Sequence, residues 1–471
     1  MRAVFVDILE DLYDRQGIYP LAAALKQAGI EVEYLCSARP ERLISGIRSL
    51  QPQLVMYSSF SHTLPAYARF DALLKQRYPV TSIIGGSGPT FNPGYIDQTT
   101  IDAACIGEGD HALVEFIVGG FRPGKNIRVR GEQFSGLMHP LADLDSLPIP
   151  DRHIIYRQDS VRANIPSKQF VSGRGCPYLC TYCFNHSYNN MMRPHGKVIR
   201  KKSVDYLFEE LNSVRRHYPL NLVLFNDDTF IVDRNWLFEF SERYPSAIGI
   251  QYGCNIRANL IDEDIVRALK QSGCVAINWS IESGDETLRN SVLKRNMSDE
   301  QILKTADLLN RYGIRHRIGN LIGLPGETRQ QMLNTVELNI KTRPVYALAN
   351  IFVPYPGLDL TRYAIEKGYY TEIPEEQLPK GYFSHSALNI SPEENRWIQK
   401  LLYIFPLFVR FPQLFYNRTA RAAMFRLPKL ILRPVYELFY GLMFRKVYKV
   451  TSTSLNNIRF YLRYLKSIAG L

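Results

Sequence analysis

Three cysteines within eight residues constrain this chain more than any other feature of its sequence. Cys176, Cys180 and Cys183 follow the pattern C-x-x-x-C-x-x-C. A closed zinc site takes four ligands, whereas three thiolates can hold three irons of a cubane iron–sulfur cluster and leave the fourth iron open. An open iron can bind and reduce a further molecule. The alternatives are three unrelated structural cysteines, or a zinc site that a distant His completes.

The residues before the motif predict where it lies in the fold. Phe170-Val171-Ser172 reads as the end of a strand, and Gly173-Arg174-Gly175 reads as a glycine-rich loop. Enzymes built from alternating strands and helices place their chemistry at the carboxyl ends of the strands. We therefore expect the three cysteines at such an edge.

The motif, with the aromatic Tyr182 before its last cysteine, resembles the signature of the radical S-adenosylmethionine (SAM) superfamily. In that family the open iron chelates the amino and carboxyl groups of SAM. An electron from the cluster then cleaves SAM to methionine and a 5′-deoxyadenosyl radical. The resemblance implies that Cys176, Cys180 and Cys183 ligate a 4Fe-4S cluster, and that a reductase such as a flavodoxin or ferredoxin supplies the electron.

Residues 1–118 alternate short apolar strands with helical spans, which predicts a doubly wound parallel sheet. Ligands of such sheets lie at the carboxyl ends of the strands. Small or polar residues occupy the predicted ends, as a close-fitting ligand requires. They are Ser58, Ser59, Gly85, Gly86, Gly107 and Glu108.

This region resembles the cobalamin-binding domain that precedes many radical SAM enzymes. The resemblance rests on Tyr19 to Leu25, Ile84 to Thr90 and Ile106 to Asp110, and it implies that the strand-end residues contact cobalamin. The family's better-known loop carries a His that ligates cobalt, but no His lies between Asp7 and Gly17, and Asp14 stands near its place. We expect cobalamin to bind without a protein imidazole. The alternative is a flavodoxin-like domain whose site is vestigial or serves another ligand.

The remainder divides into a linker over 119–168, a barrel over 169–360 and a helical C-terminal region over 361–471. Six strand candidates separated by helical patterns predict an open, partial (β/α)6 barrel, which is the radical SAM fold. They are Gln169–Ser172, Leu222–Phe225, Ile248–Tyr252, Val275–Ile281, Arg317–Leu324 and Leu348–Val353. The predicted fold class is therefore α/β, with a cobalamin-binding-like sheet, a partial TIM barrel and a helical tail.

Polar residues at the barrel's strand ends are candidates for holding SAM. Glu282 suits the ribose hydroxyls or amino group, Arg257 the carboxylate, and the Gly323–Gly326 turn a close backbone approach to adenine. These stretches resemble the family's SAM-contacting segments. The full candidate set is Tyr182, Asp227, Arg257, Glu282, Ser283 and Gly323. Asp228 is a further candidate, and the alternative for any of these acids is a solvated loop residue or a helix cap.

Three histidines could also serve the site. His186 and His195 follow the cysteine motif, where a proton donor or a substrate contact could lie, and His62 follows a strand end of the first domain. The alternative for each is an ordinary loop or surface histidine, which we favour.

The positive charge is concentrated in the tail. Residues 391–471 contain 14 Lys and Arg against 3 Asp and Glu, a net of +11 out of the chain's +12. Sixteen aromatic residues are interleaved with these cations, from Trp397 to Tyr464. Apolar residues mixed with Lys and Arg are typical of helices that lie on an anionic bilayer. The alternative is a helical cap over the barrel with a solvated basic face. No motif supports nucleic-acid binding.

The other four cysteines, Cys36, Cys105, Cys254 and Cys274, lie scattered in apolar runs and are expected to be free buried thiols. The first residues lack the layout of a signal peptide. These features favour a reducing, cytoplasmic location. The basic tail adds the expectation of a peripheral position at the inner membrane face.

The resemblance implies a cobalamin-dependent radical SAM enzyme. The favoured reaction is methyl transfer to an unactivated carbon of a small-molecule or lipid-type substrate, in which the radical abstracts hydrogen and methylcobalamin delivers a methyl group. One alternative is a cyclisation or rearrangement that uses cobalamin without methylation. Another is a non-catalytic cobalamin-binding protein with an inert barrel.

Overall fold

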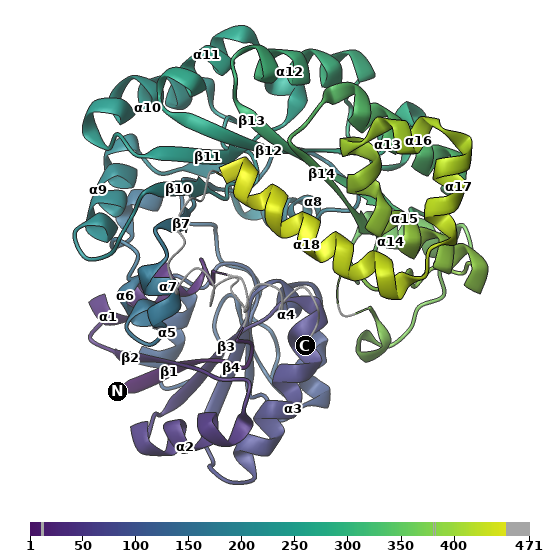
Figure 1. Cartoon of the computed structure of the whole chain (residues 1–471). Coiled ribbons are helices and arrows are strands. Elements are labelled where there is room, and N and C mark those ends of the chain that lie inside the picture. The colour runs from purple at the N-terminus through teal and green to yellow at the C-terminus, as the bar shows by residue number, and fades with distance from the viewer. Residues whose placement is uncertain (11–13, 380, 382, 449–471) are drawn as a thin grey trace.

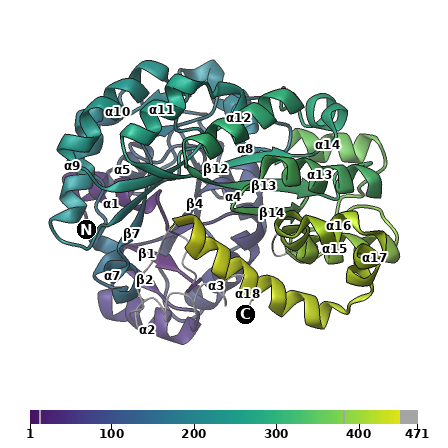
Figure 2. The same ribbon diagram turned by 45° about the horizontal axis from the view of Figure 1, so that its top comes forward.

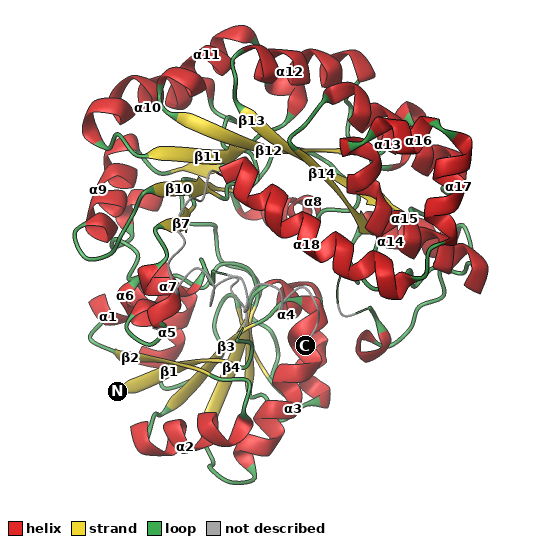
Figure 3. Cartoon of the chain, in the orientation of Figure 1, coloured by secondary structure: helices red, strands yellow, loops and turns green. Residues whose placement is uncertain are grey.

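The computed structural model contains two α/β units stacked on one another, with a group of helices from the C-terminal region on the second unit (Figure 1). The structure describes residues 1–10, 14–379, 381 and 383–448. Each unit is built on its own six-stranded sheet, as Figure 3 shows for the yellow strands.

The first sheet has the strand order β2-β1-β3-β4-β5-β6, in which β6 alone is antiparallel to its neighbour. Parallel strands run outward from β1 in both directions, so a crevice forms at the carboxyl ends where the order reverses. The strands are β1 (Arg2–Asp7), β2 (Glu31–Cys36), β3 (Leu54–Ser58), β4 (Thr81–Gly85), β5 (Ala103–Cys105) and β6 (Ile127–Val129). The helices are α1 (Ile18–Gln27), α2 (Pro40–Leu50), α3 (Leu64–Lys75), α4 (Ser87–Phe91) and α5 (Ala112–Val118).

Much of the span expected to be a linker packs onto this first unit. β6 extends the first sheet, and the short helices α6 (His153–Tyr156) and α7 (Ser160–Asn164) follow. Ile154 and Ile155 are fully buried in the same apolar cluster as Phe5 of β1. The physical reason is the apolar run in α6, which gains free energy by burial that a solvated linker would forgo.

The second sheet contains six parallel strands in the order β7-β10-β11-β12-β13-β14. Among the described strands β7 does not pair with β14, so the barrel is partial. The strands are β7 (Ser167–Phe170), β10 (Leu222–Phe225), β11 (Gln251–Asn255), β12 (Cys274–Glu282), β13 (Arg315–Ile322) and β14 (Tyr346–Ile351). A small hairpin, β8 (Gly173–Arg174) with β9 (Arg200–Lys201), follows β7.

Helices cover the outer face of this sheet, as Figure 2 shows. Those that contribute to its apolar core are α9 (Val204–Arg215), α10 (Arg234–Ala247), α11 (Glu263–Gln271), α12 (Asp299–Arg311) and α13 (Arg329–Thr342). Helix α8 (Phe184–Met192) borders the cavity between the two units, and α14 (Asp359–Glu366) follows β14. The third strand begins at Gln251, three residues after the predicted Ile248. Helix α10 runs to Ala247, and Gly249 ends it with a φ of +67° that a glycine adopts without strain.

The C-terminal region forms a cap on the barrel within its described part. It consists of α15 (Pro392–Arg410), α16 (Pro412–Tyr416), α17 (Arg418–Arg426) and α18 (Lys429–Tyr448). Helix α15 buries Leu401 and Phe405 in the barrel core. Helix α18 packs on the other side of the strands, where Tyr346 and Leu348 of β14 meet Tyr436 and Tyr440. At its end, the Tyr448 hydroxyl donates a hydrogen bond to Oδ1 of Asn278, at 2.7 Å.

Most described aromatic residues of the tail face inward. Of the thirteen between Trp397 and Tyr448, only Phe411 and Tyr416 are exposed. Phe460, Tyr461 and Tyr464 lie outside the described residues. The aromatic side chains of 391–448 therefore do not support a membrane anchor, because packing against the barrel already accounts for them. In the described part of the chain, every helix is too short or too polar to span a bilayer.

Candidate active site between the two sheets

The three cysteines lie on the loop between β8 and α8. Gly175 precedes them with a φ of +87°, and a Cβ there would lie 2.4 Å from the carbonyl oxygen of Val198, so only glycine fits. Cys183 is the N-cap residue of α8, where the helix dipole favours a thiolate. Burial raises the pKa of the Cys183 thiol to about 12. Iron coordination would supply the positive charge that displaces this proton.

Among the described residues, no three His, Cys, Asp or Glu side chains converge as the ligands of a single metal ion would. Three thiolates that hold a cubane cluster bind three different irons. The four remaining cysteines are unbridged; Cys36 is half-buried and the others are buried.

Arg257 lies directly beside the cysteine loop. Its Nη1 donates a hydrogen bond to Sγ of Cys180 at 3.3 Å, and its guanidinium carbon lies 3.7 Å from the ring centroid of Tyr178. Arg257 is 4% exposed. The structure thus places this cation where it can stabilise a thiolate or a nearby carboxylate.

Glu282 belongs to a buried network with Tyr182 and Arg295. The Tyr182 hydroxyl donates to Oε1 of Glu282 at 2.9 Å, and Nη1 of Arg295 donates to that hydroxyl at 2.7 Å. Arg295 also forms an ion pair with Glu282 at 3.7 Å. Burial raises the pKa of Glu282, and Arg295 opposes that effect. Glu282 has a φ of +70°, a strained conformation that places it at a register shift in β12.

The glycine turn after β13 is held by a carboxyl group that sequence reasoning passed over. Gly323 has a φ of +67° and lies against Ile398 of α15. Oε2 of Glu327 accepts a hydrogen bond from the backbone N–H of Leu324 at 3.0 Å. Burial raises the pKa of Glu327 to about 8. Glu327 is therefore a support of the turn.

Asp227 and Ser283 are directed into the scaffold. Asp227 accepts hydrogen bonds from the N–H and hydroxyl of Ser172, at 3.0 and 2.5 Å, and from Lys201 at 3.1 Å. Ser283 is fully buried, and its hydroxyl accepts from the N–H of Asp285 at 3.2 Å. These bonds join strand ends and loops. By contrast, Asp228 is exposed to solvent beside the cysteine loop.

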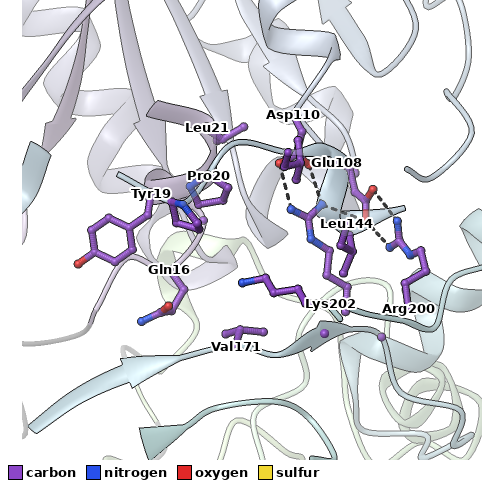
Figure 4. A pocket seen from close by; sticks show the side chains of 18 of the residues that line it. Gln16, Tyr19, Pro20, Leu21, Glu108, Asp110, Leu144, Val171, Arg200 and Lys202 are labelled. Atoms are coloured by element: carbon purple, nitrogen blue, oxygen red, sulfur yellow. Dashed lines mark hydrogen bonds and ion pairs between the residues drawn. The ribbon is translucent and has the colours of Figure 1, made fainter. Parts of the chain in front are cut away.

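A cavity of about 440 Å³ lies between the two units (Figure 4). Four of the six strand-end residues of the first sheet line it: Ser58, Gly86, Gly107 and Glu108. Asn185 and Tyr188 of α8 line it from the barrel side. The cavity therefore connects the carboxyl edge of the first sheet to the helix that begins at the last motif cysteine.

Glu108 joins the two units through ion pairs. Its carboxylate binds Arg200 of β9 and lies 3.4 Å from Arg174 of β8. Asp110 binds Arg174 through two hydrogen bonds, at 2.6 and 3.0 Å. Figure 4 shows Glu108, Asp110 and Arg200 at one wall of the cavity. Glu108 was expected to contact cobalamin, but these contacts engage its carboxylate.

Asp14, near the place of the missing His, is also engaged. Tyr19 donates its hydroxyl to Asp14, Nε2 of Gln16 donates at 2.8 Å, and Arg152 lies 3.7 Å away. The residues that line the cavity all lie in the described part of the chain, and none of them is a histidine.

The three histidine candidates lie apart from this cavity wall. His186 is buried, and its Nε2 pairs with Asp359 at 2.8 Å, a contact that fixes α8 to α14. His62 is half-buried and stacks on Phe60. Burial lowers the pKa of His62. The backbone carbonyl oxygen of His195 bonds to the His139 ring.

Close packing of the chain against itself requires a glycine at position 86. A Cβ on Gly86 would lie 2.4 Å from the carbonyl oxygen of Ser59, so there is no room for a side chain. The hydroxyls of Ser59 and Tyr188 are buried without a hydrogen-bond partner in the structure. Tyr188 lines the cavity, so a polar ligand could satisfy its hydroxyl group.

Family models match both units. Residues 1–117 match the B12 binding domain, and residues 170–338 match the radical SAM superfamily. This chain is a radical SAM protein with an N-terminal B12-binding domain. These two domains imply a 4Fe-4S cluster, SAM and cobalamin as the cofactors.

This chain is similar to several proteins whose names are known. An uncharacterized methyltransferase of Pyrococcus horikoshii is 27% identical over 60% of this chain and 62% of its own length. The anaerobic magnesium-protoporphyrin IX monomethyl ester cyclase of Rubrivivax gelatinosus is 23% identical over 67% of this chain and 59% of its own length. The match thus spans less than two thirds of either relative. OxsB, a cobalamin-dependent SAM radical enzyme solved with aqua-cobalamin and SAM, has the same fold. Its TM-score is 0.69 at 13% identity, over 100% of this chain and 75% of that one.

Proposed function

We propose that this radical SAM protein is a cobalamin-dependent enzyme that transfers a methyl group to an unactivated carbon of a small-molecule or lipid-type substrate. One observation carries the proposal. The cavity at the edge of the B12-binding sheet is also lined by Asn185 and Tyr188, which lie two and five residues after the motif cysteine Cys183. A substrate between the two units would therefore be near both reactive groups.

The bound cofactors would supply a hydrogen-abstracting radical and a transferable methyl group, with an electron from a flavodoxin- or ferredoxin-type reductase. The chain's own residues position them. In this proposal Cys176, Cys180 and Cys183 hold the cluster. Glu282, Arg257 and the Gly323 turn contact SAM, and Tyr182 and Arg295 orient Glu282.

Two other functions stay open to test. A relative named as a cyclase favours cyclisation or rearrangement as the second candidate. A non-catalytic cobalamin-binding protein is the third, but it leaves unexplained why Arg257 and Glu282 lie together with the cysteine loop in one buried network.

Product analysis distinguishes the three functions. Anaerobically reconstituted protein would be incubated with SAM, methylcobalamin, a reductant and an extract of the producing cells. Methyl transfer predicts 5′-deoxyadenosine together with a metabolite that gains one CH2 unit, as measured by mass spectrometry. Deoxyadenosine without a mass gain would indicate cyclisation or rearrangement. Absence of both would leave the non-catalytic function.

The cofactor assignments have separate readouts. The chain with Cys176→Ala, Cys180→Ala and Cys183→Ala should lose the cluster's visible absorbance and deoxyadenosine formation while it retains cobalamin. Paramagnetic resonance of the cob(II)alamin form should show no nitrogen splitting from an axial imidazole, because no histidine lines the described cavity. A clear nitrogen triplet would contradict this second expectation.

We further propose that the protein works in the cytoplasm and associates peripherally with an anionic membrane surface. The support is the net charge of +11 over residues 391–471. A basic surface is attracted to anionic lipid headgroups, and salt screens the attraction.

A further inference from the structure

Helix α18 exposes an apolar stripe on the side that faces away from the barrel. The stripe consists of Ile431, Val435, Leu438 and Leu442, whose exposed fractions are 50%, 43%, 67% and 51%. Leu430, 86% exposed, adjoins its first turn. Monomeric soluble proteins rarely expose contiguous apolar surface of this kind without a binding role.

The spacing makes these residues one surface. Positions separated by four, three and four residues lie above one another on a helix. From Ile431 to Leu442 the stripe runs for roughly 17 Å at 1.5 Å per residue. The opposite side of α18 is already occupied, because Leu432, Tyr436 and Tyr440 are buried against the barrel. Helix α18 is thus apolar on two sides, and only one of them is explained by packing.

Basic residues accompany the stripe. Residues 418–448, which form α17 and α18, contain seven Lys and Arg and one acidic residue, Glu437. Five of these cations are exposed: Arg418, Arg426, Arg433, Arg445 and Lys446. Arg445 and Lys446 follow Leu442 within about one helical turn, on either side of the line of the stripe.

The positive charge decides which of two partners covers the stripe, a second copy of this chain or an anionic lipid surface. Pairing the stripe with that of a second copy would bring two strongly basic surfaces together, and like charges repel at such an interface. An anionic bilayer offers an apolar layer for the aliphatic side chains and negative headgroups for the flanking cations. We propose that the α18 stripe is the face by which this protein lies on an anionic lipid surface.

This inference rests on the proposed membrane association and names the surface responsible. In this proposal the aliphatic residues of the stripe, and not the aromatic residues of the tail, insert into the lipid surface. Helix α18 also borders the barrel strands through the bond from Tyr448 to Asn278. Docking through the stripe would therefore hold the barrel next to the lipid surface, where a lipid-type substrate would be available.

Vesicle flotation with the full-length protein tests the proposal. Vesicles of phosphatidylglycerol and phosphatidylcholine would be compared with vesicles of phosphatidylcholine alone. The stripe variant carries Leu438→Ser and Leu442→Ser. The matched control carries Val118→Ser and Ile365→Ser, two exposed apolar residues elsewhere on the molecule, 69% and 42% exposed. Circular dichroism and melting should be unchanged in both variants, since all four residues are exposed.

The expected result has three parts. The wild type and the control bind anionic vesicles at low salt, the stripe variant binds at least roughly tenfold more weakly, and ~0.5 M salt weakens wild-type binding. If the wild type does not bind, the proposed membrane association is wrong, and this inference fails with it. If all three proteins bind equally, the association stands and the stripe is not its surface. A concentration-dependent dimer that only the stripe variant abolishes, without vesicle binding, would show that a second copy occupies the stripe.

Discussion

At the scale of single residues, Glu282 is the most informative side chain of the barrel. It is held by Tyr182 and Arg295 at a strained backbone position. If it contacts SAM, Glu282→Gln should weaken SAM binding about tenfold, because a charged acceptor binds hydroxyl and ammonium donors more strongly than a neutral amide. Equilibrium dialysis of the cluster-loaded protein measures this. Tyr182→Phe is the control, since it keeps the ring and should reduce binding less. Unchanged affinity in Glu282→Gln would remove this residue from the site.

Glu327 should make stability depend on pH. Burial raises its pKa in the folded state to about 8, from an ordinary value of 4.5. The folded state therefore binds the proton that the unfolded state has lost over that interval. Stability contributed by the neutral carboxyl should fall as pH rises from about 4.5 to about 8, by up to about 1.4 kcal/mol per pH unit. The apparent melting temperature across this range tests the prediction. Glu327→Gln retains an acceptor for the N–H of Leu324 and should reduce the slope; an equal slope would contradict the assignment.

At the scale of elements, the β8–β9 hairpin joins the cavity loop of the first sheet to the cysteine loop. Arg174 lies two residues before Cys176 and binds Asp110, which is 5% exposed. Burial alone would raise the pKa of Asp110, but Arg174 lowers it below its ordinary value. The pair should therefore stabilise the fold above the ordinary Asp pKa and lose its effect as pH falls through the lowered one.

Removing one partner of such a pair leaves an uncompensated charge. We expect Asp110→Ala to destabilise the protein by about 3 kcal/mol and to make the junction of the two units more sensitive to proteolysis. Asp97→Ala is the matched control, because Asp97 pairs with Arg128 on the surface, where such a contact contributes about 1 kcal/mol or less. Urea unfolding and limited proteolysis measure both. Equal effects of the two substitutions would show that the hairpin contact has no special role.

At the scale of the whole molecule, the C-terminal helices are part of the barrel's structure. Leu401, Leu402 and Phe405 of α15 are fully buried in the barrel core. Each large-to-small substitution in such a core costs about 2–5 kcal/mol. The free-energy cost of removing the whole helix therefore exceeds the net stability of a typical domain. A chain truncated after Ile390 should therefore lose near-ultraviolet circular dichroism and expose apolar surface to a fluorescent dye. A truncated chain that melted like the full-length protein would contradict this.

Several features followed from local sequence patterns. The spacing of Cys176, Cys180 and Cys183 predicts a shared cluster, because the three side chains lie on one short loop. Apolar runs located the strands of both sheets apart from β6, which lies in the span expected to be a linker. Strand ends such as Ser58 and Gly86 were readable because parallel strands bring their carboxyl ends to one edge. These inferences needed only neighbouring residues and the period of the pattern.

Other features depended on contacts between distant segments. No local signal marks Arg295 as the partner of Glu282, or Arg174 as the partner of Asp110, since packing alone brings them together. Asp227 and Asp228 are adjacent in sequence, yet one bonds to Ser172 and the other is exposed. The tail shows the same limit. The sequence determined its charge and its aromatic content, but the tertiary structure decided which sides of α15 and α18 the barrel covers, because burial depends on what packs against each side.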